Sequence, residues 1–267
     1  MVSYEGQYGA LLRGIADEAD AMSLDCFRDS SLRVERKMDG TALTEADGAI
    51  EKMARKRVAE SGLALDVYGE EQGTGGGAKA GAAVASGPAE RARLIIDPID
   101  GTEEFSRGIP TFGTLLGIEL NGEIVAGMCS APALGTRWWA YRGEGAFRNG
   151  EKVHVSRTPR LGEAMVFTTG TGPSKNAEDR ARIRRLLDFS RNSRCLGGFW
   201  QHMLVAEGAI DAALDWTSKP WDLAPLGVIV EEAGGRSTNV LGERTIYSGD
   251  YLSTNGAIHE EAMKLLR

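Results

Sequence analysis

The chain has few residues that bind soft metals or form disulfides: three cysteines and three histidines among 267 residues. Cys26, Cys129 and Cys195 are widely spaced and form no Cys-x-x-Cys motif, so neither a disulfide framework nor a thiolate zinc site is indicated. None of the histidines belongs to a His-Glu-x-x-His arrangement. The sequence therefore predicts isolated thiols in a reducing compartment.

Long apolar runs and clustered positive charge are also lacking. No apolar stretch approaches the roughly 20 residues that span a membrane, and the first residues contain no signal-peptide core. Lys and Arg number 31 against 38 Asp and Glu, a formal charge of −7, with no basic stripe interleaved with aromatics. We therefore expect a cytoplasmic protein with neither a membrane nor a nucleic acid as partner. If its substrate is an anion, metal ions must reverse the local charge.

Three common catalytic motifs are absent. No Gly-x-Ser-x-Gly elbow of a serine hydrolase occurs. The glycine-rich stretch 73–87 lacks the Gly-Lys-Ser/Thr of a P-loop and precedes no apolar helix, so we interpret it as a loop near the active site and a candidate lid. Asp97 and Asp100 are separated by two residues, whereas phosphatases with an aspartyl nucleophile use Asp-x-Asp. That spacing argues against such a nucleophile.

Amphipathic helical patterns are present near both ends of the chain. In the first, Leu11, Leu12, Ile15 and Ala19 recur at helical spacing. The second opens with Thr44-Glu-Ala-Asp47, which has the form of a capping box. Together the patterns predict helices over residues 8–27, 44–62, 176–189, 199–213, 223–232 and 255–266.

Strand patterns dominate the middle third of the chain. Asn121-Gly122 and Asn149-Gly150 lie between alternating segments, and Asn-Gly is the strongest short signal for a hairpin turn. This third is therefore predicted to be a largely antiparallel sheet. Strands are expected within residues 63–68, 92–97, 111–120, 123–131, 137–143, 145–147, 164–170, 193–198 and 212–216.

Helices and strands thus alternate around two sheets, which indicates a layered α/β (α+β) architecture. A chain of this length can hold two subdomains that share a core. We predict an N-terminal α+β subdomain over residues 1–160, with the large antiparallel sheet and most of the acidic residues considered next. A C-terminal α/β subdomain over residues 161–267 would complete the site.

The stretch IIDPIDGTEE, residues 95–104, joins a buried strand to a short helix. Pro98 fixes its own φ and keeps Asp97 extended, so no helix can begin there. Gly101 then permits a sharp turn, and Thr102 begins a helix with two glutamates in its first turn. The sequence predicts a rigid hook at the end of the strand.

This hook brings oxygen donors together. Asp97 and Asp100 can point the same way, joined by the carbonyl of Ile99, and such hard ligands suit Mg²⁺. The amides of Gly101 and Thr102 would face outward as an anion site at a helix N-terminus. The alternative is an ordinary turn, because aspartate is common in turns and helix caps.

Further acids lie at the ends of other predicted elements. Glu70 and Glu71 end a strand, Asp222 begins an apolar helix, and Asp47 closes the capping box. Each has a plain structural alternative, as an exposed pair, an N-cap or a cap partner. With the hook these make four sites, all of them oxygen donors, and together they predict a cation-binding active site.

These residues resemble the signatures of a known family. Gly69-Glu-Glu71, Asp97-Pro-Ile-Asp-Gly-Thr102, and Trp221-Asp222 followed by Gly234-Gly235 are similar to the three motifs of the inositol monophosphatase family. The similarity runs from about Ala19 to the C-terminus. It implies an αβαβα sandwich and Mg²⁺-dependent hydrolysis of a small phosphate monoester by metal-activated water, without a phosphoenzyme and with inhibition by Li⁺.

The resemblance also implies a role for each matching residue. Thr102 and Asp47 would orient and deprotonate the attacking water, with Glu70 beside them in catalysis and Glu71 as its supporting neighbour. The amides of Gly101 and Thr102 would cradle the phosphate. The ligands of two or three Mg²⁺ ions would be Glu70, Asp97, the Ile99 carbonyl, Asp100 and Asp222.

Within the family, segments 130–140, 143–147 and 203–208 look most like the histidinol-phosphatase branch, which implies conversion of L-histidinol phosphate to L-histidinol in histidine biosynthesis. The branch commonly places an aspartate beside the glycine before Phe199-Trp200, but here Gly197-Gly198 stand there. Alternatives are an inositol-1-monophosphatase, a sugar or 3′-phosphoadenosine phosphatase, and, in another class, a non-catalytic phosphate-ligand binding protein.

Substrate contacts and partners complete the predictions. Asp215, Gly198 and Phe199 are the candidate substrate-binding residues, with a strand-end turn as the alternative for Asp215. Three tryptophans, Trp138, Trp139 and Trp200, could border an imidazole, but core packing is the commoner use of tryptophan. Lys37 is expected to be an exposed lysine rather than a neighbour of the metal site. A homodimer is predicted, with the middle hairpins and the Trp138-Trp139 pair as its candidate interface.

Overall fold

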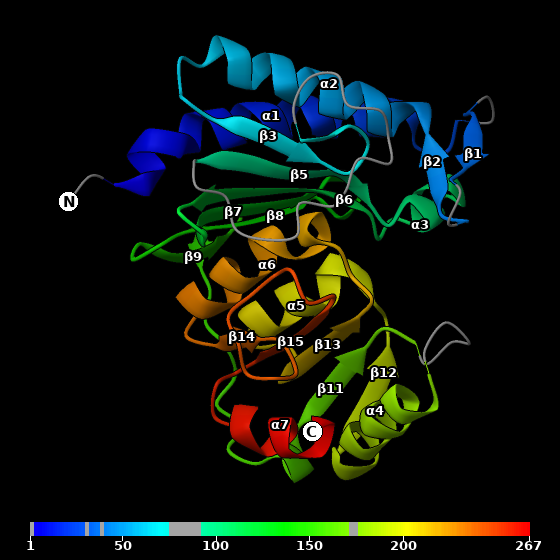
Figure 1. The fold of residues 1–267 in the computed structure, drawn as a ribbon, viewed down its shortest axis with the longest axis vertical. Helices are drawn as coiled ribbons and strands as arrows, with labels where there is room; N and C mark the ends of the chain where they lie inside the picture. The colour runs from blue at the N-terminus through cyan, green and yellow to red at the C-terminus, as the bar shows by residue number, and fades with distance from the viewer. Residues whose placement is uncertain (1–2, 30–31, 38–39, 75–91, 171–175) are drawn as a thin grey trace.

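The computed structural model describes residues 3–29, 32–37, 40–74, 92–170 and 176–267. They form five layers in which helices and sheets alternate (Figure 1). This αβαβα sandwich confirms the predicted fold class. The outer helical layers are α1 (Tyr4–Cys26) with α2 (Glu45–Glu60), and α4 (Ala177–Phe189) with α7 (His259–Leu266); the inner one is α5 (Gly198–Ala206) with α6 (Pro220–Glu232).

The first sheet has the strand order β10-β9-β8-β7-β6-β5-β3-β4 and is antiparallel except between β3 and β5. Both predicted Asn-Gly turns are confirmed, since Asn121 and Asn149 have φ of 51° and 49°. Tight hairpins need such values. The strands are β3 (Asp66–Gly69), β4 (Gly73–Thr74), β5 (Arg93–Asp100), β6 (Gly113–Leu120), β7 (Glu123–Ala131), β8 (Thr136–Tyr141), β9 (Gly145–Arg148) and β10 (Glu151–Lys152).

The second sheet has the order β12-β11-β13-β15-β14, with β12, β11 and β13 parallel and the other two pairings antiparallel. Two short strands form a separate ribbon beside the first sheet, and three short helices connect larger elements. The remaining elements are β1 (Val34–Arg36), β2 (Ala42–Thr44), α3 (Thr102–Ser106), η1 (Pro132–Leu134), η2 (Leu161–Glu163), β11 (Met165–Thr168), β12 (Asn192–Cys195), β13 (Ala212–Trp216), β14 (Arg236–Thr238) and β15 (Asp250–Thr254).

Several details of the sequence prediction are wrong, including the starts of α6 at Pro220 and of α7 at His259. The helix expected over 199–213 ends at Ala206, because Gly208 turns with φ +74° and its backbone lies against His154. Strands β1, β2, β4, β10, β14 and β15 were not predicted. In β14 and β15 buried polar side chains stand beside apolar ones such as Leu252, so the strand pattern is weak. The structure satisfies these groups internally: Ser253 bonds to His202 at 2.8 Å, and Thr254 bonds to His259 at 3.0 Å.

Helix α6 lies unusually close to the first sheet. Two glycines face it, Gly117 on β6 and Gly127 on β7. A Cβ at Gly127 would be 2.6 Å from Val228 Cγ1 and 2.8 Å from the Pro225 carbonyl oxygen. This close approach places the first turn of α6 beside the end of β5.

Replacing Gly127 by alanine should therefore destabilise the fold by about 1–3 kcal/mol, because the added methyl forces α6 away from the sheet. Gly14→Ala is the matched control: its Cβ would have no neighbour within 4 Å in α1, so a gain of up to about 1 kcal/mol is expected. Urea unfolding of both variants measures the difference. Equal midpoints for the two would contradict the close approach.

Three further predictions concern the membrane, the candidate lid and the subdomain boundary. No described helix is long and apolar enough to cross a membrane. Most of the candidate lid, residues 73–87, lies outside the described residues. The chain passes from the first sheet to the second between Lys152 and Met165, and the division into subdomains at residue 160 stays a prediction.

The homodimer also stays a prediction. Trp138 is a core residue with 1% of its surface exposed, so it was wrongly expected at an interface. Trp139 is half-buried and stacks on Phe147 with ring centroids 6.0 Å apart. Of the pair, Trp139 alone stays a candidate contact.

Candidate active site

Three carboxylates meet where β5 ends and α6 begins. Asp97, Asp100 and Asp222 each offer an oxygen, and these oxygens lie within 4.8 Å of one another. The β5–β6 pairing shifts register between Asp97 and Asp100, as expected around Pro98, which lacks an N–H. The Thr114 hydroxyl bonds to the Pro98 carbonyl at 2.8 Å and holds the hook.

The third acid comes from a distant segment. Pro220 occupies the first turn of α6, and Trp221 packs edge-on against Tyr68 of β3 with ring centroids 5.5 Å apart. The Lys219 N–H donates to Asp222 Oδ2 at 2.8 Å. The N-cap role considered for Asp222 is wrong, because Lys219 is the N-cap and Asp222 is the third residue of α6. Asp222 accepts the N–H of the N-cap and also belongs to the acidic cluster.

Burial makes these acids electrostatically costly. Burial, and then repulsion by neighbouring carboxylates, raise the pKa of Asp97 and of Asp222 well above their usual range, and the pKa of Asp100 to about 7. Asp97 Oδ1 is buried and has no hydrogen-bond partner among the described residues. A hard divalent cation would both neutralise this crowding and satisfy that oxygen, so the donor set fits Mg²⁺.

Glu70 and Glu71 follow β3. Glu70 lines the same cavity as the three aspartates, and one lysine contacts both glutamates. Lys37 Nζ lies 2.6 Å from Glu70 Oε1 and 2.7 Å from Glu71 Oε1. The prediction of an exposed Lys37 is wrong, because the β1–β2 ribbon carries its side chain, only 21% exposed, to these acids. Burial still raises the pKa of Glu71 to about 7.

Glu51 also supports this turn, and the sequence reasoning missed it. Its carboxylate accepts the Glu71 N–H at 2.8 Å and pairs with Arg55 at 2.7 Å. A Cβ at Gly69 would lie 2.4 Å from the Glu51 carboxyl carbon, so only glycine fits there. The available signal was the position of Glu51 one helical turn after Asp47, on the buried face of α2.

Asp47 and Thr102 lie together although 55 residues separate them. Thr102 Oγ1 is 3.4 Å from Asp47 Oδ1 and 2.8 Å from the Ile99 carbonyl oxygen. Asp47 Oδ2 accepts the Thr44 N–H at 2.8 Å, so the capping box is real and leaves the other oxygen for Thr102. Burial raises the pKa of Asp47 to about 6, which is suited to a group that exchanges protons near neutral pH.

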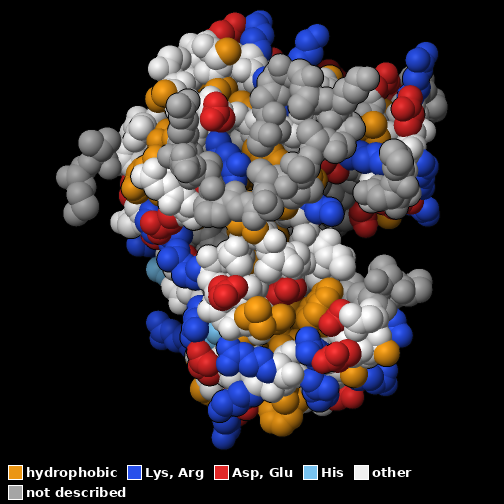
Figure 2. Space-filling view, viewed as in Figure 1, with side chains coloured by type: hydrophobic (Ala, Val, Ile, Leu, Met, Phe, Trp, Pro, Cys, Tyr) orange, Lys and Arg blue, Asp and Glu red, His pale blue; other side chains and the backbone are white. Residues whose placement is uncertain are grey.

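A cavity of about 530 Å³ opens beside the acidic cluster, and the surface is hollowed on the side of α3 and β2 (Figure 2). Its lining includes Glu70, Asp97, Asp100 and Asp222, but not Asp47 or Glu71. Arg36 and Lys219 also line it; Arg36 pairs with Glu103 at 2.7 Å, and Lys219 offers positive charge to an anion. Gly101, before α3, has φ +80°, and a Cβ there would lie 2.8 Å from the Thr111 carbonyl. Glycine is thus required where the chain turns past the cavity.

A second cavity of about 320 Å³ adjoins the first, since Asp100, Gly101 and Glu104 line both. Gly198 lines its wall, and the Phe199 N–H donates to Asp100 Oδ2 at 3.0 Å. The Phe199 ring is 2% exposed and packs against Trp138. Phe199 therefore contributes its backbone to this region while its ring belongs to the core.

Asp215 is close to the cluster but buried. It is 3% exposed, lines neither of these two cavities, and adds to the repulsion felt by Asp100. Gln201 donates to one of its oxygens, and His202 Nε2 lies 3.3 Å from the other. The sequence analysis did not identify Gln201 and His202, which hold Asp215 from α5.

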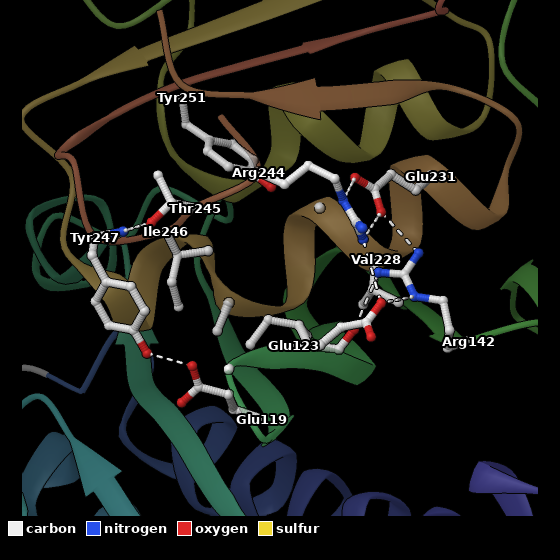
Figure 3. A pocket seen from close by; sticks show the side chains of 14 residues that line it. Glu119, Glu123, Arg142, Val228, Glu231, Arg244, Thr245, Ile246, Tyr247 and Tyr251 are labelled. Carbon is white, nitrogen blue, oxygen red and sulfur yellow. Dashed lines mark hydrogen bonds and ion pairs between the residues drawn. The ribbon is translucent and has the colours of Figure 1, made fainter. Parts of the chain in front are cut away.

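Figure 3 shows another cavity of about 320 Å³ that shares no lining residue with these two. Arg142 and Arg244 both reach Glu231 of α6, at 2.8 and 2.9 Å. Glu123 lies 3.5 and 3.6 Å from the same two guanidinium groups. These charges neutralise one another and connect the β6–β7 turn to the second half of the chain, so we interpret the cavity as a structural joint.

The arrangement of buried acids defines a class of phosphatase. The chain belongs to the inositol monophosphatase family, whose model matches residues 10–267. This family is metal-dependent, and the chain is accordingly a phosphoric monoester hydrolase.

Particular relatives narrow the comparison. The chain is 36% identical to the histidinol-phosphatase of Streptomyces coelicolor over 94% of both chains, and 36% identical to that of Mycobacterium tuberculosis over 96% of both. A fructose-1,6-bisphosphatase/inositol-1-monophosphatase of Thermotoga maritima is 38% identical over 64% of this chain. An IMPase structure from Thermotoga maritima superposes with a TM-score of 0.80 and 29% identity, covering 95% of this chain and 94% of its own.

Proposed function

We propose that this protein is an Mg²⁺-dependent phosphatase that hydrolyses L-histidinol phosphate to L-histidinol and phosphate. One observation carries the metal-dependent chemistry: three aspartates from two distant segments converge, and one buried oxygen has no partner among the described residues. The likeness to two histidinol-phosphatases over nearly the whole chain supports the substrate.

The proposed ligands are all oxygen donors around the larger cavity. They would hold two or three Mg²⁺ ions, which supply charge neutralisation of the phosphate and acidification of water. Glu71 and Lys37 would steady Glu70, since Lys37 contacts both glutamates. The ligands are Glu70, Asp97, the Ile99 carbonyl, Asp100 and Asp222.

The chain's own residues would handle the proton. Thr102 Oγ1 can accept a hydrogen bond from the attacking water while donating to Asp47, and Asp47 takes up the proton. The water oxygen forms the new P–O bond and the P–O bond to the alcohol breaks. The alcohol oxygen takes a proton from solvent water and Asp47 returns its proton to solvent, so ester and water give alcohol and phosphate. The amides of Gly101 and Thr102 would hold the phosphate oxygens during this exchange.

The test is phosphate release from a panel of monoesters, with and without Mg²⁺. The panel contains histidinol phosphate, inositol 1-phosphate, fructose 1,6-bisphosphate and 3′-phosphoadenosine 5′-phosphate. We expect release only with Mg²⁺ and the highest kcat/KM for histidinol phosphate. If inositol 1-phosphate has the highest kcat/KM, the second candidate, an inositol-1-monophosphatase, is correct; the Thermotoga relative favours it. Binding of phosphate esters without turnover would instead indicate a non-catalytic binding protein.

A further inference from the structure

We propose that Glu104 selects the leaving group of the substrate by pairing with a cationic amine. This inference rests on the proposed phosphatase function and assigns the cavity beside the acidic cluster to the alcohol part of the substrate. Glu104 is the third residue of α3 and lines both cavities, together with Asp100 and Gly101. It therefore stands between the site proposed for the phosphate and the cavity proposed for the leaving alcohol.

The Glu104 side chain has no hydrogen bond or ion pair to any described residue. Its neighbour Glu103 differs: Glu103 pairs with Arg36 at 2.7 Å and with Arg107 at 2.6 Å. Of these two adjacent glutamates, Glu103 is neutralised by two arginines, whereas the carboxylate of Glu104 is available to a ligand. An available carboxylate at a cavity wall can bind a cation from the ligand.

The described residues that line the adjoining cavity carry charge of one sign. Among the described residues that line it, Asp100 and Glu104 are the charged ones, and none of these described residues is a lysine or an arginine. Asp100 faces the other acids of the cluster and accepts the Phe199 N–H. Even when a metal ion takes the charge of Asp100, Glu104 keeps this cavity negative, which attracts an ammonium and repels a second phosphate.

The rest of the wall suits a flat apolar ring. Trp200 is half-buried and Leu196 is 38% exposed, and both line this cavity. Gly197 and Gly198 stand where histidinol-phosphatases commonly have an aspartate, and they add no side chain. In this cavity Glu104 supplies the carboxylate instead. The substrate class is therefore a phosphate monoester of an amino alcohol that carries an aromatic or apolar group.

A matched pair of substrates tests the proposal. Histidinol phosphate carries the amine, and 3-(imidazol-4-yl)propyl phosphate is the same molecule without it. For the wild-type protein we expect kcat/KM to be higher for the amine by about tenfold or more, mainly through KM, as for one charge-assisted contact. Glu104→Gln should reduce this ratio to near one, and Glu104→Asp should restore part of it.

Glu103→Gln is the matched control. It removes the same charge from the residue next to Glu104, but Glu103 is already paired with two arginines. Its substrate ratio should equal that of the wild type. An unchanged ratio in Glu104→Gln, or an equal fall in Glu103→Gln, overturns the assignment even if all variants hydrolyse both compounds. The proposed function fails separately, when the wild-type protein with Mg²⁺ releases phosphate from neither.

Discussion

Asp97→Asn and Asp222→Asn should each lower Mg²⁺-dependent phosphate release by more than about a hundredfold, because loss of an outer partner alone already weakens metal sites 10–100-fold. Both carboxylates belong to the converging set, and Asp97 supplies the oxygen without a partner. An amide keeps the shape of the side chain but has no charge to hold a divalent cation. The measurement is kcat/KM at saturating Mg²⁺, paired with titration calorimetry of Mg²⁺ binding.

Stability distinguishes this effect from misfolding. Without Mg²⁺ the asparagine variants should be at least as stable as the wild type, since each replaces a carboxyl that is costly to ionise in its buried site by a neutral amide of the same shape. Asp66→Asn is the control, because Asp66 begins β3, is exposed and lies at the opposite end of that strand from Glu70. It should retain wild-type activity. Wild-type rates in Asp97→Asn would remove the basis of the metal assignment.

The metal-free protein should lose stability as the pH rises from about 6.5 to about 8. A carboxyl whose folded pKa is raised stabilises the fold fully below its unfolded pKa, and this contribution is lost as the pH rises through the folded value. Burial places the pKa of Asp100 and of Glu71 at about 7, within this window. Each unit of difference between folded and unfolded pKa corresponds to about 1.4 kcal/mol, and most of this contribution is already lost below pH 6.5. For two groups with a folded pKa of about 7, the loss that remains between pH 6.5 and 8 is about 1–2 kcal/mol.

The pH interval begins at about 6.5 because below this pH a histidine changes the stability in the opposite direction. Burial lowers the pKa of His259 to about 4, so protonation of the unfolded chain makes stability increase with pH until the ordinary histidine pKa of about 6.5 is passed. Urea unfolding at pH 6.5 and 8, in EDTA and in Mg²⁺, measures the change. Mg²⁺ should abolish the decline and release protons on binding. A metal-free protein that gains stability over this interval would contradict the electrostatic account.

Local sequence rules were sufficient for much of the site. In the stretch from Asp97 to Thr102, proline and glycine restrict the backbone within a few residues, so the hook could be predicted without knowledge of the fold. The capping box at Thr44 and Asp47 depends on atoms three residues apart and was likewise predictable. Helix ends were less predictable: α5 ends where Gly208 meets His154, a residue from another part of the chain.

The sequence by itself determined the residue chemistry, the helices and hairpins, and the family to which the chain belongs, because periodicity, turn residues and motifs are local properties. Only the tertiary structure decided which acids meet. Lys37 follows β1 and Glu70 follows β3, and only folding brings the two together; Phe199 of α5 likewise packs against Trp138 in the core. Whether a carboxylate is neutralised, as in Glu103, or available, as in Glu104, depends on side chains that packing brings from distant segments.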